Sequence, residues 1–229
     1  MRLGTISTRK RYRALATDGD GTLLMGGRLA EATRESLDRF AAAGGTLLLV
    51  TGENLQDLKE FPHLSCFRLV VAENGGVCHD PATGRRARLG PRWPGGRGAT
   101  LRRRGVAPLK IGEVSIGTKL RHRRTVLSLL RELGLDYRVV RNRKDVIILP
   151  PNVTKATGLA HALDRLGIDP CAVVAIGDAE NDMMLLEECG LGVAVANAAR
   201  CLKKQAERVT AGRFGKGVRE VIDAILRAE

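Results

Sequence analysis

The sequence predicts an α/β protein built on a mostly parallel sheet. Short apolar runs such as 46–50 and 172–176 are bounded by glycine or turn residues, and the segments between such runs carry apolar residues at helical spacing. The composition agrees with this class. The 229 residues, 44% hydrophobic and 28% charged, are typical of a globular chain with one large domain, or a core and a smaller second unit.

The amino-terminal third alternates strands and helices. Leu37, Phe40 and Ala41 have helical spacing, and Gly44 and Gly45 end that helix. Apolar runs that stop at turn residues predict the strands. The expected elements are a strand at 12–17, a helix at 30–43, a strand at 46–50, a short helix at 54–60 and a strand at 69–72, followed by a turn at 74–76.

The middle of the chain breaks this rhythm. Residues 81–105 are rich in Gly, Pro and Arg and are expected to be mainly loop. A small α+β unit follows and ends at Pro150 and Pro151. Its expected elements are a strand at 110–116, a helix at 121–133 and strands at 137–140 and 145–149.

The α/β rhythm returns after Asn152. The expected elements are a helix at 154–166, a strand at 172–176, a helix at 182–189, a strand at 191–196 and helices at 198–207 and 217–228. The simplest organisation is one α/β core interrupted by an insert. We predict the first part of the core at 1–78, the insert at 79–150 and the second part of the core at 151–229.

The net charge of +13 is concentrated in the predicted insert. Residues 79–150 contain fifteen Arg and three Lys against five Asp and Glu, whereas the rest of the chain is neutral. One interpretation is an arginine-rich, solvated surface. The other is a module whose field attracts anionic partners.

Several classes of protein are disfavoured. Aromatic residues make up only 3%, which argues against single-strand nucleic-acid binding by base stacking. No apolar run approaches the ~18–20 residues of a membrane span, and residues 1–11 lack the apolar core of a signal peptide. The five cysteines are widely spaced and form no C-x-x-C motif, so a reduced, cytoplasmic location is expected.

Two pairs of acidic residues follow predicted strands. Asp18 and Asp20 come after the first strand, and Asp178 and Asp182 come after a later one. Ligands of open α/β sheets bind at the carboxyl ends of the strands, and four carboxylates there are suited to a hard cation such as Mg²⁺. Each pair alone is also compatible with a simple turn.

The order of these residues along the chain resembles the haloacid dehalogenase superfamily of phosphotransferases, and within it the Cof-like subgroup of sugar phosphatases and archaeal phosphoglycolate phosphatases. The resemblance implies a Rossmann-like core with a small α+β cap between the second and third motifs, where the basic insert lies. It depends on Asp18-Gly-Asp20-Gly21-Thr22-Leu23, Thr51-Gly52, Glu73-Asn74-Gly75-Gly76, Asn152-Val-Thr-Lys155 and Gly177-Asp178-Ala-Glu-Asn181-Asp182.

The resemblance also implies a chemistry. Asp18 would be the nucleophile that forms an aspartyl-phosphate, and Asp20 would protonate the leaving group and then activate water. The implied cofactor is Mg²⁺, held by Asp18, the backbone carbonyl of Asp20, Asp178 and Asp182, the last directly or through water.

Three further residues would bind the phosphoryl group. Thr51 would donate its hydroxyl, Lys155 would neutralise charge, and Asn181 would bond the phosphoryl group or orient Lys155. Each assignment has a simpler alternative, since Thr51 could cap a short helix and Lys155 could be solvated. Asp182 could likewise be an acid favoured at a helix N-terminus, and Asn74 a turn residue.

The chain departs from the family at Glu53, where an arginine commonly follows Thr-Gly, and this change is expected to affect a salt bridge or the substrate entrance. Substrate specificity is expected to reside among Arg121, Arg141, Arg143 and Lys144.

The expected function is a Mg²⁺-dependent phosphatase for a small anionic phosphomonoester, such as a sugar phosphate or a phosphoglycolate-like compound. The alternatives are a phosphomutase of the same superfamily, or a module that binds nucleic acid or an acidic partner through the insert. A membrane partner is not expected, and nucleic acid is disfavoured. The sequence leaves the oligomeric state open.

Overall fold

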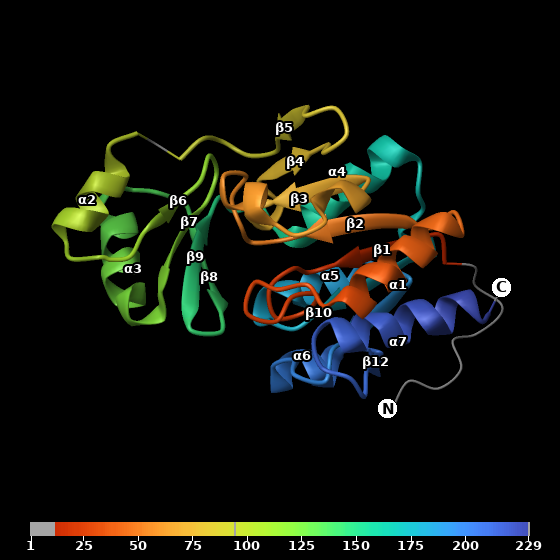
Figure 1. Ribbon diagram of the computed structural model, residues 1–229. Helices are drawn as coiled ribbons and strands as arrows, with labels where there is room; N and C mark the ends of the chain where they lie inside the picture. Colours follow the sequence, from red (N-terminus) through yellow and green to blue (C-terminus); the bar gives the residue numbers. More distant parts are fainter. Residues whose placement is uncertain (1–11, 94, 229) are drawn as a thin grey trace.

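The computed structural model describes residues 12–93 and 95–228, which form a larger and a smaller β-sheet (Figure 1). The strands of the larger sheet are β1 (Ala14–Thr17), β2 (Thr46–Val50), β3 (Leu69–Ala72), β4 (Val77–His79), β5 (Arg86–Arg88), β10 (Val173–Gly177), β11 (Leu191–Ala194) and β12 (Arg208–Val209). Its helices are α1 (Glu31–Ala42), α4 (Lys155–Leu166), α5 (Met183–Glu187), α6 (Arg200–Gln205) and α7 (Gly215–Leu226).

The larger sheet has the order β12-β11-β10-β1-β2-β3-β4-β5. The pairs from β12 to β3 are parallel, and β4 and β5 add an antiparallel edge. Helices α1 and α7 pack together on one face, and α4 and α5 pack together on the other (Figure 1). The predicted α/β class with a mostly parallel sheet is confirmed.

The central strands are apolar because helices cover both of their faces. Every residue of β1, β3 and β10 is buried. A strand buried on both faces appears in the sequence as a continuous apolar run rather than an alternating one. This is why the strands at 46–50, 69–72 and 172–176 could be predicted to within about one residue.

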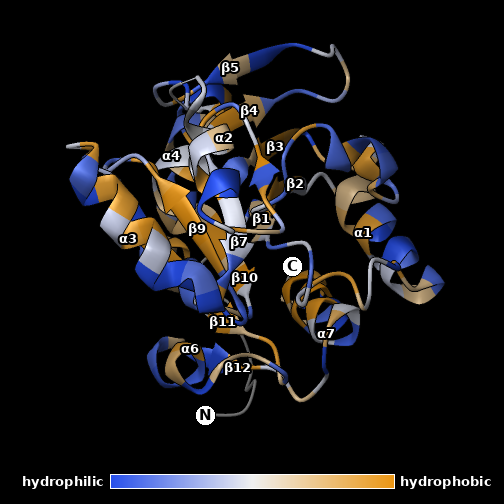
Figure 2. Cartoon of the chain, turned by 90° about the vertical axis from the view of Figure 1, so that its left-hand side faces the viewer, coloured by the Kyte–Doolittle hydropathy of each residue, from blue (hydrophilic) through white to orange (hydrophobic). Residues whose placement is uncertain are grey.

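The smaller sheet belongs to the predicted insert. Its antiparallel strands have the order β6 (Lys110–Ile111), β7 (Ile116–Lys119), β9 (Asp145–Leu149) and β8 (Arg138–Asn142), and helices α2 (Arg97–Arg103) and α3 (Arg123–Glu132) accompany it. Figure 2 shows the apolar side of α3 next to β9.

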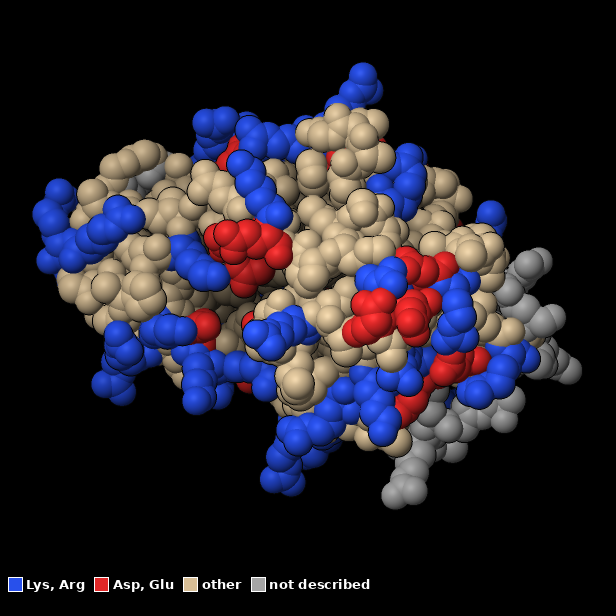
Figure 3. Space-filling view, in the orientation of Figure 1, with Lys and Arg blue, Asp and Glu red and all other residues tan. Residues whose placement is uncertain are grey.

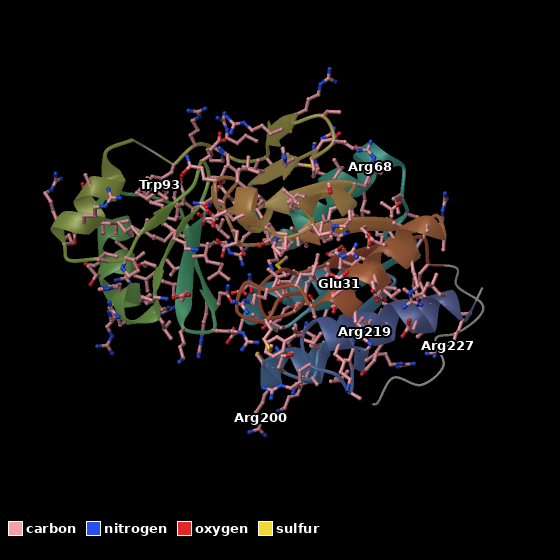
Figure 4. All side chains as sticks on the ribbon, viewed as in Figure 1. Glu31, Arg68, Trp93, Arg200, Arg219 and Arg227 are labelled. Carbon is pink, nitrogen blue, oxygen red and sulfur yellow. The ribbon has the colours of Figure 1, made fainter. Side chains whose placement is uncertain are left out.

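The insert has a hydrophobic cluster of its own. Leu101 and Val126 of the helices pack with Ile116 and Ile148 of the sheet. Trp93, labelled in Figure 4, lies beside this cluster with its ring edge-on to Tyr137, at a centroid distance of 5.0 Å. The insert therefore packs as a unit and meets the larger sheet at one end (Figure 1).

Two stretches of the insert differ in detail from the prediction. The stretch 81–105 is mainly loop, as expected, but it also contains β5 and α2. Helix α2 has a weak sequence signal because Leu101 is its buried hydrophobic anchor. The strand expected at 110–116 is a hairpin, because residues 112–115 form a turn between β6 and β7.

The predicted boundary at residue 78 lies inside β4. The predicted insert therefore includes β5, yet this strand pairs with β4 and extends the larger sheet. The short helix expected at 54–60 is a single 3₁₀ turn at Asp57–Glu60.

The prediction about residues 1–11 concerns a segment outside the described residues. Within residues 12–93 and 95–228, none of the helices has the length and apolar character that crossing a membrane requires.

Candidate active site

The candidate site lies where three neighbouring strands of the larger sheet end. Asp18 follows β1, Thr51 follows β2 and Asp178 follows β10, and β1 pairs with both of the other strands. Parallel strands bring their carboxyl ends to one edge, so residues 160 positions apart in sequence become neighbours. The predicted convergence of the two acidic pairs depends on this geometry.

Three carboxylates form a buried cluster at this edge. Oxygen atoms of Asp18, Asp178 and Asp182 all lie within 4.8 Å of one another. Their residues are 5%, 1% and 0% exposed. Hard carboxylate oxygens at this spacing fit a divalent cation such as Mg²⁺. The simple-turn alternative does not explain why acids of both pairs, Asp18 with Asp178 and Asp182, meet inside the protein.

Lys155 joins two of these carboxylates. It is the first residue of α4, and Thr154 caps that helix by accepting a hydrogen bond from the Thr157 amide. Its Nζ lies 2.5 Å from Asp18 Oδ1 and 2.7 Å from Asp182 Oδ1. The side chain is 1% exposed, so the alternative of a solvated lysine is wrong.

Burial and charge oppose each other in this cluster. Burial alone would lower the pKa of Lys155, but the carboxylates of Asp18 and Asp182 outweigh it and raise that pKa. Burial raises the pKa of Asp18 well above its usual range, and Lys155 only partly counteracts this. Burial and the nearby Asp182 likewise raise the pKa of Asp178. Positive charge at this site therefore stabilises the ionised cluster.

Asp182 also organises the loop after β10. Its Oδ2 accepts hydrogen bonds from the backbone N–H groups of Asp178, at 2.9 Å, and Ala179, at 3.0 Å. Its Oδ1 accepts from Lys155. Both oxygens are thus engaged within the protein.

Asp20 differs from the buried acids. It is exposed and lines the same pocket as Asp18. It lies two residues after Asp18, in a turn where its backbone forms a β-bridge with Leu24. Its carboxylate is not one of the three that cluster. The position suits a group that exchanges protons with a molecule in the pocket.

Thr51 is 2% exposed and lines the pocket. Its hydroxyl oxygen accepts the Glu53 N–H at 3.2 Å, but the following 3₁₀ turn at Asp57–Glu60 has Gln56 as its N-cap, so Thr51 does not cap that turn. A hydroxyl that accepts through its oxygen retains its proton for donation, and both roles are compatible.

Asn181 does not contact Lys155 through any hydrogen bond found among the described residues. Its Nδ2 donates instead to Asn74 Oδ1 at 2.8 Å. Asn74 does occupy a left-handed turn conformation, with φ of 53°, as expected for a turn residue. Its side chain has a second role, because it positions Asn181 at the pocket wall.

The insert forms part of the wall of a pocket of about 450 Å³ at the site. The larger sheet contributes Asp18, Asp20 and Thr51, and the insert contributes strands β7 and β9 and the turn between β8 and β9. At the wall, Glu53 pairs with Lys110 of the insert at 2.9 Å, so Glu53 forms a salt bridge between the larger sheet's side and the insert. In Figure 3, Lys and Arg also line the outer edge of the insert, away from the pocket.

The structure separates the four predicted specificity residues. Arg143 and Lys144 line the pocket. Arg141 pairs with Glu180 at 3.4 Å beside it, whereas Arg121 donates to the Ala107 carbonyl and does not line it.

Arg143 contacts the acid cluster directly. Its guanidinium donates to the Asp178 carboxylate and, at 3.3 Å, to the Asn197 carbonyl. The other carboxylate oxygen of Asp178 accepts from the Thr22 hydroxyl at 3.2 Å. Neither contact is evident from the sequence, because Thr22 and Asp178 are joined only by the folding of the larger sheet and Arg143 reaches Asp178 only through the packing of the insert.

Comparisons with known proteins agree with this site. A sequence profile of haloacid dehalogenase-like hydrolases matches residues 110–222. The chain is 31% identical over 233 residues to a phosphoglycolate phosphatase of Methanothermobacter thermautotrophicus, covering 92% of this chain and 97% of that protein. It is 32% identical over 222 residues to a phosphoglycolate phosphatase of Natronomonas pharaonis, covering 91% and 96%.

Solved structures share the fold. A haloacid dehalogenase-like hydrolase from Bacteroides thetaiotaomicron superimposes with a TM-score of 0.78 at 21% identity, covering 93% of this chain and 99% of the other. A sugar phosphatase of subclass IIB of that superfamily gives a TM-score of 0.77 at 18% identity, covering 92% and 98%. Given the near full-length relationship to the archaeal proteins and the strand-end carboxylates with their buried lysine, the chain belongs to the haloacid dehalogenase-like hydrolases.

Proposed function

We propose that the protein is a Mg²⁺-dependent phosphatase that hydrolyses a small phosphomonoester through an aspartyl-phosphate on Asp18. The observation that carries this proposal is the buried network of Asp18, Lys155 and Asp182 beside Asp178. Lys155, held between two carboxylates, partly offsets the burial of Asp18 and favours its ionised form, and an ionised carboxylate is a nucleophile.

In the first half-reaction, Asp18 forms a bond to phosphorus and the bond from phosphorus to the leaving oxygen breaks. Lys155 holds Asp18 Oδ1, which leaves Oδ2 to attack. Asp20 gives its proton to the leaving oxygen, so the alcohol departs neutral. Thr51 and Lys155 donate to the phosphoryl oxygens, where charge gathers in the transition state.

In the second half-reaction, water attacks the phosphorus of the aspartyl-phosphate. Asp20, now ionised, takes a proton from that water, and the bond from phosphorus to Asp18 breaks. Inorganic phosphate and the original carboxylate are regenerated, and every proton is accounted for.

Asp18, Asp178 and the backbone carbonyl of Asp20 would hold the cation, and Asp182, whose oxygens are both engaged, would reach it through water. When bound, Mg²⁺ supplies positive charge that lets the carboxylate and phosphate anions approach each other. Asp178 would then exchange its contact with Arg143 for the cation.

The insert would act as the cap that closes over the substrate. Lys144 lines the pocket and has no salt-bridge partner among the described residues, whereas Lys110 and Arg141 are paired with core acids. A substrate with a second anionic group would use this free charge. Phosphoglycolate, named in the archaeal relatives, has such a group. A cytoplasmic location remains the prediction from the cysteines, which are all free.

The two alternatives are weaker. A phosphomutase would need the phosphoryl group to return to the substrate, and no observation favours this. A nucleic-acid module would leave the buried lysine and carboxylates without a use, and several of the insert's cations are already paired with acids of the core.

The test is a panel of small phosphomonoesters, including phosphoglycolate and p-nitrophenyl phosphate, assayed by phosphate release with Mg²⁺ and with EDTA. We expect turnover that requires the cation and is faster for the doubly anionic substrate. Turnover that survives thorough chelation would overturn the metal dependence. Tight, salt-sensitive RNA or duplex binding without any turnover would favour the binding module.

A further inference from the structure

Glu73 is a buried acid that the mechanism above does not use. It directly follows β3, and it is 1% exposed. Its backbone φ is 53°, a left-handed value that a glutamate rarely adopts. A strained backbone and a buried charge persist together only where the surrounding contacts require them.

The carboxylate of Glu73 binds a turn of the insert. The backbone N–H of Glu113 donates to Oε1 at 2.9 Å, and those of Val114 and Ser115 donate to Oε2 at 2.8 and 3.1 Å. The Ser115 hydroxyl adds a contact of 3.4 Å. These donors all lie in the turn 112–115 between β6 and β7, where the sequence predicted a continuous strand.

The fit leaves no spare room. A methyl group at Gly112 would collide with the carboxylate of Glu73, and one at Gly76 would collide with Val114. Because Gly112 and Gly76 lack a side chain, the turn of the insert can pack directly against the segment that contains Glu73.

The backbone of residues 73–75 is also hydrogen-bonded to the loop that carries Thr51. The Glu73 N–H donates to the Glu53 carbonyl at 2.9 Å, and the Asn74 N–H donates to the Thr51 carbonyl at 3.0 Å. The Asn74 side chain holds Asn181, and Gly75 lies against the start of α4 next to Lys155. The segment 73–75 therefore contacts the phosphoryl-binding side of the site through its backbone and the insert through one carboxylate.

We propose that Glu73 is a positioning residue that sets how the insert sits over the active site. Its carboxylate holds the turn 112–115, and as a result Ser115 of that turn and Gly117 and Thr118 of β7 line the pocket. The effect of Glu73 on KM rests on the proposed phosphatase function. The contact between Glu73 and the turn 112–115 can be tested without any enzymatic activity.

The first test is hydrogen exchange measured on Glu73→Gln. The amide has the shape of the carboxylate, but its NH₂ group would face N–H donors and the negative charge is lost. We expect the amides of 113–115 to exchange at least tenfold faster, whereas those of β1 and β10 keep their protection. Glu73→Asp, which keeps the charge on a shorter chain, should give an intermediate rate. Unchanged exchange at 113–115 would overturn the proposal.

The second test compares two binding constants in the same variant. Under the proposed function, inorganic phosphate as a competitive inhibitor would contact only the core residues, whereas the second anionic group of phosphoglycolate would reach the insert. We expect Glu73→Gln to raise the KM for phosphoglycolate about fivefold and to leave the inhibition constant for phosphate unchanged. Equal changes in both constants would indicate general disruption and would overturn a positioning role.

Gly112→Ala disrupts the same contact from the side of the insert, and it serves as the second variant if Glu73→Gln folds poorly. It should reproduce the faster exchange and the KM effect, because the added methyl displaces the carboxylate. Gly95→Ala, at an insert position with open space around it, is the matched control and should change neither. A wild-type protein without phosphatase activity would reject the proposed function, while the exchange experiment would still decide the role of Glu73.

Discussion

Asp18 is paired with Lys155 inside the protein, and this pairing determines what its substitution should do. Asp18→Asn keeps the volume and the hydrogen-bonding positions but removes the anionic nucleophile. We expect turnover to fall about a thousandfold or more, the scale seen when a nucleophile is removed. The melting temperature should move by no more than about 5 °C, since one buried charge is lost together with one ionic partner of Lys155.

The measurement for Asp18→Asn is phosphate release with Mg²⁺, together with circular dichroism on a sample checked for deamidation. Retained turnover in such a sample would show that another residue is the nucleophile.

Arg143 and a divalent cation should compete for Asp178. Arg143→Asn removes the guanidinium, and asparagine tolerates the left-handed conformation found there, with φ of 53°. Because Arg143 is 46% exposed, its ion pair is worth about 1 kcal/mol at most, and Mn²⁺ should bind up to about fivefold more tightly. Calorimetric titration of the purified protein measures this directly.

Lys144→Asn is the matched control for this titration. It removes one charge from the same turn without breaking a contact to Asp178, so only a smaller change from the altered field is expected. Equal effects of the two substitutions would mean that the contact of Arg143 does not matter.

At the scale of one element, α4 carries Lys155 and packs closely against the segment that contains Glu73. A methyl group at Gly158 would lie 2.5 Å from Gly75 Cα and from Val71 Cγ1. Alanine favours a helix by about 1 kcal/mol over glycine, whereas overpacking costs about 1–3 kcal/mol. We expect Gly158→Ala to lower the free energy of unfolding in urea, and to reduce kcat because Lys155 moves with the helix.

Ala160→Gly supplies the control on the exposed face of α4. It should lower the free energy of unfolding by about 1 kcal/mol through helix propensity alone, with no effect on kcat. A Gly158→Ala protein that is more stable than wild type would show that α4 can shift without cost.

At the scale of the whole molecule, the basic insert meets acidic residues of the core on two sides of the pocket. Lys110 pairs with Glu53, and Arg141 pairs with Glu180. These contacts are exposed or half-buried, so salt should weaken both them and the attraction of an anionic substrate. Raising NaCl from about 50 to about 500 mM should increase the KM for a substrate with a second anion about threefold.

The comparison substrate is an aryl phosphate with a neutral leaving group, whose KM should rise less. Thermal unfolding at both salt concentrations controls for stability and should change by only a few degrees, because exposed pairs contribute little. Equal rises in KM for both substrates would assign the charge of the insert to solvated surface rather than to selection.

The local sequence pattern determined the central strands of the larger sheet and the order of the site residues along the chain. The strands β2, β3 and β10 could be predicted because strands covered on both faces must be continuously apolar. The positions of Asp18, Thr51, Lys155 and Asp178 in the chain order also predicted the family, which the comparisons bear out. The roles given to these residues remain predictions, although the structure brings their side chains to one edge of the sheet.

Tertiary structure alone decided the contacts between the insert and the core. The turn at 112–115 reads as a strand in the sequence, and it exists where the carboxylate of Glu73, some forty residues earlier, accepts its N–H groups. The pairing of Asn74 with Asn181 and the contact of Arg143 with Asp178 likewise join distant segments. Periodicity reports which residues are buried within one element. It carries no information on which buried polar group of one sheet faces which turn of the other, because that depends on how the two sheets pack.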